Sequence, residues 1–103
     1  MIIATTENIA GRQISQVLGI VSGSTVRSRN VGRDIMAGFK NLVGGEISEY
    51  TKLLQQAREE AIKRMTEDAE NLGADAVVNV RFNTANITQG ASEILVVGTA
   101  VKL

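Results

Sequence analysis

Cysteine and histidine are both absent from this chain of 103 residues. Without cysteine there can be no disulfide, and without either residue the thiolate and imidazole ligands of ordinary zinc sites are missing. Catalysis by a cysteine nucleophile or by a histidine-based triad is excluded for the same reason. Any metal site would therefore have to rely on oxygen ligands, which suit hard ions such as Ca²⁺ or Mg²⁺.

Aromatic side chains are also scarce, since Phe39, Tyr50 and Phe82 are the only three. Base-stacking platforms and aromatic cages are therefore poorly supplied. The 11 basic and 11 acidic side chains cancel, so net charge gives no support for nucleic-acid binding. The charge is unevenly spread: residues 1–45 carry five basic and two acidic side chains (+3), residues 46–75 four and eight (−4), and residues 76–103 two and one (+1).

Long apolar runs are missing as well. No stretch approaches the ~18 apolar residues of a membrane span. The first residues, MIIATTENIAG, lack both a basic region and a long apolar run, so they do not predict a signal peptide. We expect a soluble, cytoplasmic protein that forms a single domain over residues 1–103.

The strongest pattern in the chain is helical. Apolar or small residues recur every three or four positions, which is typical of one face of an amphipathic helix: Tyr50, Leu54, Ala57, Ala61, Met65, Ala69 and Leu72. We predict a helix from Ser48 to Leu72, ended by a left-handed Gly73. A shorter helix is predicted over residues 31–43, with Asn30 as its N-cap, and Gly44-Gly45 separates the two.

Strands are predicted on either side of these helices. Residues 13–29 are rich in Val, Ile, Ser and Thr, and Gly19 and Gly23 are expected to divide or bend this long segment. The other predicted strands are Met1–Ala4, Ala76–Asn83 and Ser92–Leu103, with residues 84–90 as a polar connection. The sequence therefore predicts an α+β fold in which one long and one short helix pack on one face of an antiparallel sheet.

The last strand has two apolar faces. Leu95, Val97, Val101 and Leu103 share one face, and Ile94, Val96 and Ala100 share the other. We expect Val78, Val80 and Phe82 to face one side of the preceding strand. Two consecutive helices cover a single face, so the face with Val77, Ile94 and Val96 is predicted to be a subunit interface. In the alternative, a monomer, the N-terminal segment covers that face.

This assignment makes Val96 a test position. Replacing Val96 by aspartate is expected to dissociate the oligomer, because an unpaired charge would be buried at the interface.

Three groups of polar residues are candidates for a site. Arg27, Arg29 and Arg33, together with the helix start near Asn30, could bind an anion; alternatively they lie at an exposed strand end and pair with Asp34 or with a neighbouring subunit. Glu46 and Glu49 could converge around a symmetry axis as metal ligands. The neighbouring acids Glu59-Glu60 and Glu67-Asp68 point about 100° apart on the helix and do not share a proton. No catalytic residue is predicted.

The order of several motifs resembles a known family. The segments IATTENIAGRQISQVLGIVSGSTV, RNVGRDIMAGFKNLVGGEISEYTKLLQQAREEAIKRM and GADAVVNVRF are similar to the YbjQ-like family of small uncharacterised proteins. The resemblance implies a dodecin-subunit-like fold that assembles into a ring and favours a pentamer. Members are often labelled heavy-metal-binding, although soft metals prefer thiolate or imidazole ligands. No cofactor is predicted; without tryptophan the chain offers poor stacking for a flavin, which the dodecin-like architecture suggests.

Taken together, the residues predict a non-enzymatic homo-oligomer that acts as a binding or scaffold module, with any ligand at a subunit interface or central pore. The resemblance matches Arg33, Asp34 and Glu46, which form either a site between subunits or, as we favour, helix caps and pairs across the ring. Two alternatives stay open: a metal-ion binder that uses carboxylates, and an enzyme that acts on an anionic small molecule. We expect neither nucleic acid nor membrane as a partner. The predicted binding residues are Arg27, Arg29, Arg33, Asp34 and Glu46.

Overall fold

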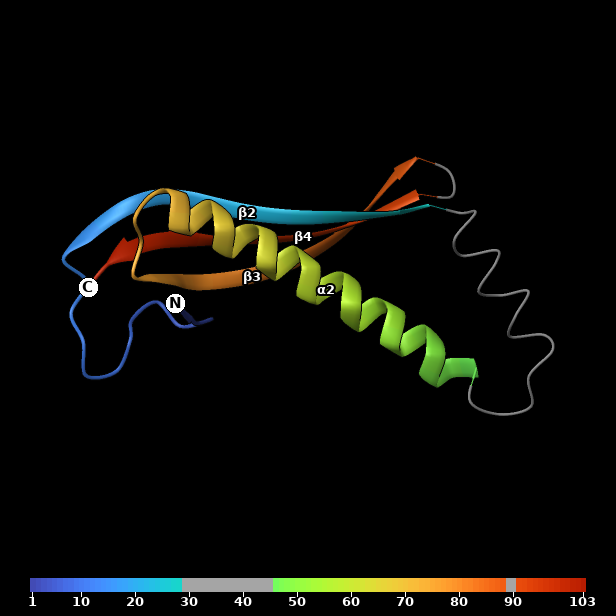
Figure 1. Cartoon of the computed structure of the whole chain (residues 1–103), viewed down its shortest axis with the longest axis horizontal. Coiled ribbons are helices and arrows are strands. Elements are labelled where there is room, and N and C mark those ends of the chain that lie inside the picture. The colour runs from blue at the N-terminus through green and yellow to red at the C-terminus, as the bar shows by residue number, and fades with distance from the viewer. Residues whose placement is uncertain (29–45, 89–90) are drawn as a thin grey trace.

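The computed structural model describes residues 1–28, 46–88 and 91–103. Within these ranges the chain forms strands β1 (Ile2–Ile3) and β2 (Gln16–Ser28), helix α2 (Glu46–Asn71), and strands β3 (Ala76–Thr88) and β4 (Ala91–Lys102). Figure 1 shows the helix lying across the strands, with both termini at the same end of the long axis. The predicted α+β class is therefore confirmed, whereas the predicted short helix over residues 31–43 lies outside the described residues.

The four strands form a mixed sheet in the order β1-β3-β4-β2. Strand β4 pairs antiparallel with both β3 and β2. Strand β1 instead pairs parallel with β3, through Ile2 with Ala76 and Ile3 with Val77. The prediction of a purely antiparallel sheet was therefore wrong, because a two-residue strand carries no local signal of its direction.

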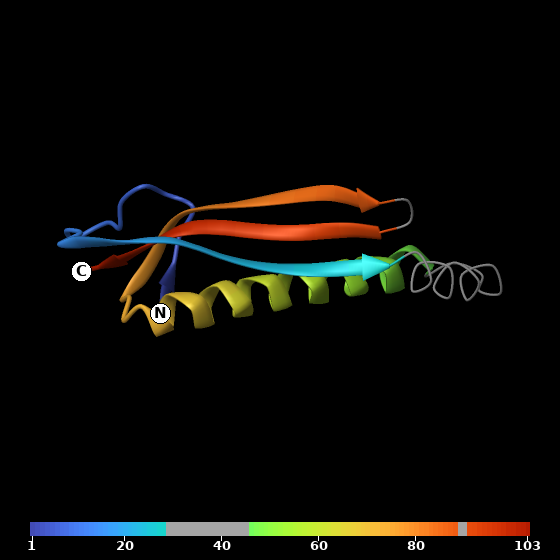
Figure 2. The ribbon, with the colours of Figure 1, turned by 90° about the horizontal axis from the view of Figure 1, so that it is seen from above.

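Helix α2 follows the predicted pattern closely. It packs on one side of the sheet, mainly against β2 and β4, and barely reaches β3 (Figure 2). Ala57, Ala61, Met65 and Ala69 are completely buried on its inner face. At its end Gly73 is left-handed (φ 77°) and donates its N–H to the Glu70 carbonyl at 2.9 Å, as the predicted C-cap requires.

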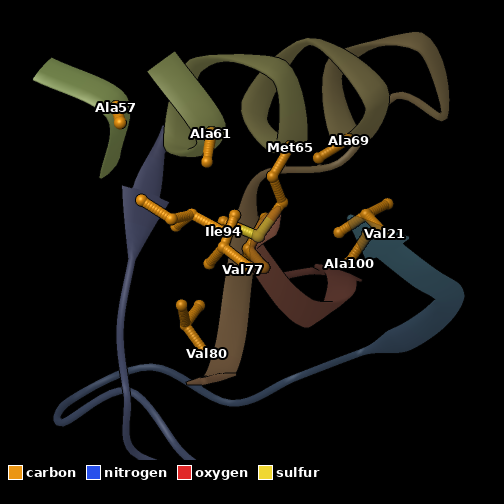
Figure 3. Close-up of a cluster of buried hydrophobic side chains, with 10 residues drawn as sticks. Val21, Ala57, Ala61, Met65, Ala69, Val77, Val80, Ile94 and Ala100 are labelled. Carbon is orange, nitrogen blue, oxygen red and sulfur yellow. The ribbon is translucent and has the colours of Figure 1, made fainter. Parts of the chain in front are cut away.

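The core beneath this helix contains residues that we had placed on the opposite face. Val77, Ile94 and Val96 are 0%, 7% and 0% exposed and pack with Met65 (Figure 3). The prediction that they form a subunit interface was wrong. An aspartate at Val96 would therefore disrupt the core of the single chain and would not report on an interface.

A bulge in β3 explains a second difference. The pairing of β3 with β4 shifts between Val78 and Arg81, and Asn79 within the shift has a positive φ of 55°. This irregularity puts Val80 in the core beneath α2, while Val78 packs on the other face of the sheet. Val78 and Val80 therefore do not share a face, contrary to the prediction from simple alternation.

Strand β3 is also longer than predicted. It continues after Asn83 to Thr88, because each residue up to Asn86 has a partner in β4. Hydrogen bonding to a neighbouring strand, which no local pattern encodes, outweighs the weak strand propensity of asparagine here.

The N-terminal segment covers one end of the sheet face opposite to α2. Ile9 and Ile14 pack there against Ala76, Val78 and Val101. The segment is held by bonds from the Ser15 N–H to the Lys102 carbonyl (2.8 Å) and from Arg81 Nη1 to the Thr5 carbonyl (2.8 Å). The alternative that we had considered for a monomer placed this segment over Val77, Ile94 and Val96; it covers the opposite face instead, because α2 already packs on those three residues.

Candidate functional site

The residues predicted to bind a ligand are only partly placed by the structure. Arg27 lies near the end of β2, where it pairs with Ser92 of β4. Glu46 is the first residue of α2, and Glu49 follows in its first turn. The end of β2 and the start of α2 lie toward the end of the molecule away from the termini (Figure 1). Arg29, Arg33 and Asp34 lie outside the described residues.

Acidic residues do not gather into a metal site in the part of the chain that the structure describes. No group of three or more aspartates and glutamates there is placed to hold an ion. In the same part of the chain, no helix is both long and apolar enough to cross a lipid bilayer. The outer side of α2 has a shallow hollow lined by Lys52, Gln55, Gln56 and Glu59. All four residues belong to one helix, and no other described element lines the hollow.

The most prominent surface is the sheet face that α2 does not cover. In β2, Val21 and Thr25 are buried under the helix, so alternation turns Ile20, Ser22, Ser24 and Val26 to the opposite side. Ile20 is 80% exposed and Val26 is 53% exposed. A long aliphatic side chain at 80% exposure gains almost nothing from folding of the single chain.

The neighbouring strand extends this surface. Ser22 pairs with Val97, Ser24 with Leu95, and Ile20 with Thr99, so these residues of β4 share the same face. Leu95 and Val97 are partly exposed, although they lie on a strand with a neighbour on each side. We define the open face as this set of residues: Ile20, Ser22, Ser24, Val26, Leu95, Val97 and Thr99.

The sequence indicated that one apolar sheet face would be left uncovered, but we predicted the wrong residues for that face. Both faces of β4 are apolar, which correctly indicated that one apolar face would be left without the helix. Ile20 and Val26 were missed, because apolar and polar residues alternate only weakly in residues 13–29 and no face was predicted for that strand. Only the position of the helix distinguishes the covered face from the open one.

Comparison with known proteins places the chain in a family. A family model of YbjQ, described as "Putative heavy-metal-binding", matches residues 1–103. The chain belongs to the YbjQ family. This confirms the resemblance that was read from the order of its motifs, and the match spans all 103 residues.

Several relatives of this YbjQ chain are similar to it over 90% or more of their length. UPF0145 proteins of Methanosarcina acetivorans and Photobacterium profundum are 58% and 59% identical to it over 103 residues, which cover 100% of this chain and 97% and 100% of the relatives. A UPF0145 protein of Thermus thermophilus is 55% identical, with coverage of 100% of this chain and 90% of the relative.

A solved structure supports the fold of the YbjQ chain. The crystal structure of a protein of unknown function from Pediococcus pentosaceus, which belongs to the DUF74 family, superposes with a TM-score of 0.64. The match covers 100% of this chain and 97% of that chain at 19% identity. At this level of identity the likeness shows the shared fold alone.

Proposed function

We propose that this protein is a cytoplasmic, non-enzymatic homo-oligomer that acts as a binding or scaffold module and assembles as a ring of five copies. The observation that carries the proposal is the open face, above all Ile20 at 80% exposure. Burying a large aliphatic side chain fully is worth about 1.5–3 kcal/mol. A sheet face that exposes four aliphatic side chains among small hydroxyl residues in a small domain is suited to an interface between subunits.

The ring and its number of subunits are supported by different arguments. A ring requires each copy to use two different surfaces, because one surface of each copy contacts the other surface of the next copy. Such head-to-tail contacts form a closed ring when the rotation between copies brings the last copy back to the first. The open face is one such surface, and the β3 side of the sheet, where Phe82 is 45% exposed, is a second. The number five is favoured by the resemblance to the family.

A ligand in this proposal lies at a boundary between subunits or in the pore. Arg27, Arg29, Arg33, Asp34 and Glu46 are the proposed contacts. Arg27 and Glu46 support this placement, because the strand that carries Arg27 and the helix that begins at Glu46 reach the same end of the molecule (Figure 1). If Arg27, Arg29 and Arg33 gather beside a helix start, they would suit an anionic small molecule, which also keeps an enzyme acting on such a molecule as an alternative.

Metal binding is the second candidate, since it is what the family description names. The donor set of this chain does not fit a soft heavy metal, because cysteine and histidine are absent throughout. Hard ions could bind to carboxylates if Glu46 and Glu49 of several copies met around the ring axis. Metal binding of this kind therefore depends on the assembly and not on the single chain.

The assembly is tested by replacing Ile20 with aspartate. We expect Ile20→Asp to dissociate the oligomer to the monomer, because several copies of a charge would be buried without partners at the interface. The molar mass is measured by light scattering after size-exclusion chromatography and by native mass spectrometry, and circular dichroism checks that the chain stays folded.

Leu72→Asp is the matched control. Leu72 is also an exposed aliphatic residue (46%), but it lies after the end of α2 and outside the open face, so this variant should assemble like the wild type. A wild-type protein that is monomeric, or an Ile20→Asp protein that still forms the intact assembly, would contradict the proposal.

A further inference from the structure

The two long edges of the sheet differ in how far the rest of the chain occupies their outward backbone groups. Strand β2 lies at one edge, and β3 forms the other edge beyond the two residues that pair with β1. The outward backbone groups of an edge strand can pair with another chain, so proteins commonly protect them. An edge that the chain leaves unprotected is open to a second copy.

At the β2 edge, side chains of α2 occupy the outward backbone groups. The Ser22 N–H donates to Asp68 Oδ2 at 3.4 Å, and Arg64 Nη1 donates to the Ser24 carbonyl at 2.5 Å. These two bonds show that the backbone groups of Ser22 and Ser24 point outward, so by alternation those of Gly23 between them point toward Val96 of β4. One acceptor and one donor from the helix thus replace two of the bonds that an incoming strand would make in the middle of β2.

Arg64 is itself held in place. Its Nε lies 3.4 Å from Glu60 Oε1, one turn earlier on the helix. This ion pair is partly exposed and contributes little stability by itself, but it reduces the number of orientations open to the guanidinium group. Arg64 and Asp68 are four residues apart, so they project from the same side of α2 over the edge.

Up to Val80 the N-terminal segment bonds the β3 edge, but from Phe82 onward this edge has no comparable protection among the described residues. Val80 donates its N–H outward to the Ala4 carbonyl (3.1 Å), and alternation turns the backbone groups of Phe82, Thr84 and Asn86 to the same side. The stretch from Phe82 to Thr88 contains neither a charged residue nor proline, the two features that commonly guard an edge. Arg81, just before it, is bound to the carbonyls of Thr5 and Val80.

We propose that Arg64 and Asp68 form an edge cap, which closes the β2 edge to strand pairing with a second copy of this chain and so keeps self-association finite. The proposal rests on the self-association inferred above. If both edges were open, one edge of each copy could pair with the other edge of the next copy. Such pairing generates an open-ended polymer unless the rotation between copies closes it into a ring. The cap leaves the β3 edge as the one that a second copy can reach.

The double variant Arg64→Ala/Asp68→Ala tests the cap. It removes both side-chain bonds without changing the net charge and leaves the buried residues of α2 in place. We expect species larger than the wild-type assembly, with a mass that rises with protein concentration in light scattering. Hydrogen exchange should also show loss of protection at the Ser22 amide when the variant is diluted below the concentration at which it associates.

The double variant Lys63→Ala/Glu67→Ala is the matched control. Both residues lie next to the cap on α2 and are exposed. Replacing them also removes one positive and one negative charge. The control should keep the wild-type mass. An Arg64→Ala/Asp68→Ala protein that is folded by circular dichroism and has the wild-type mass at all concentrations would overturn the proposal.

Failure of the edge cap is distinguishable from failure of the proposed oligomer. The mass of the wild type tests the oligomer, whereas the change in mass between the two double variants tests the cap. If the Arg64→Ala/Asp68→Ala chain does not fold, the Ser22 amide of the wild type provides the second measurement: slow exchange supports its bond to Asp68, and exchange as fast as in an unfolded chain overturns it.

Discussion

At the scale of single residues, the close approach of helix and sheet depends on Gly23. A Cβ at this position would overlap the carbonyl oxygen of Ala61 and would lie 2.5 Å from the amide nitrogen of Met65. Both are backbone atoms of α2, which cannot move out of the way as the end of a side chain can. The backbone of the helix therefore lies directly on β2 at this point, with no side chain between them.

Gly23→Ala tests this contact. Overpacking of a dense core typically costs 1–3 kcal/mol, and we expect the free energy of unfolding to fall by about 2 kcal/mol or more, measured by urea denaturation at a fixed protein concentration. Ser22→Ala is the control, since Ser22 is exposed and the substitution keeps its backbone bond to Asp68. A Gly23→Ala protein as stable as the wild type would show that the helix is not held this close.

At the scale of elements, the bulge in β3 decides which valines reach the core. Asn79 has a left-handed backbone (φ 55°) and donates its N–H to the Thr6 carbonyl at 2.9 Å. Because its side chain is exposed, substitutions at Asn79 change the backbone preference without removing buried contacts. The bulge both turns Val80 beneath α2 and ties the strand to the N-terminal segment.

Replacing Asn79 by valine and by glycine separates these effects. A β-branched residue is strongly disfavoured in the left-handed region, at roughly 1–2 kcal/mol for an ordinary side chain. Asn79→Val should therefore lower the free energy of unfolding by about that amount, whereas Asn79→Gly should change it little. Thermal or urea denaturation measures both, and equal stability of the two variants would argue against a strained position.

At the scale of the whole molecule, chemistry is limited by what the chain contains. The family description concerns heavy metals, but this chain has neither thiolate nor imidazole groups to offer them. Its surface instead provides the open face on one side and a helix with exposed charges on the other. This combination is better suited to self-assembly than to tight binding of a soft ion by one subunit.

Metal titration of the untagged protein tests this limit. An ion present at 100 times its dissociation constant would stabilise the native state by about 2.7 kcal/mol and would raise the melting temperature by several degrees. We expect no such rise with Zn²⁺ or Cd²⁺ and no stoichiometric retention of either ion in native mass spectrometry. If Mg²⁺ or Ca²⁺ stabilises the assembly, Glu46→Gln should remove the effect. Stoichiometric binding of Cd²⁺ would contradict the argument from donor chemistry.

The sequence by itself determined the class of fold and the main elements. The periodicity of apolar and small residues located α2 to within two residues at its start and one at its end, because the pattern and its Gly73 stop lie within one continuous segment. The absence of cysteine and histidine excluded whole classes of site. The two apolar faces of β4 correctly indicated that part of the sheet would be left without the helix.

Tertiary structure alone decided which face that is. Alternation is a local property and treats Ile94 and Val96 on one side like Leu95 and Val97 on the other. The helix lies on the side of Val96, where Gly23 allows close approach and where Gly98 leaves room for Val77. The direction of β1, the bulge at Asn79 and the cap made by Arg64 and Asp68 likewise depend on contacts between residues far apart in the chain. Such contacts exist only once the strands are paired and the helix has packed on them.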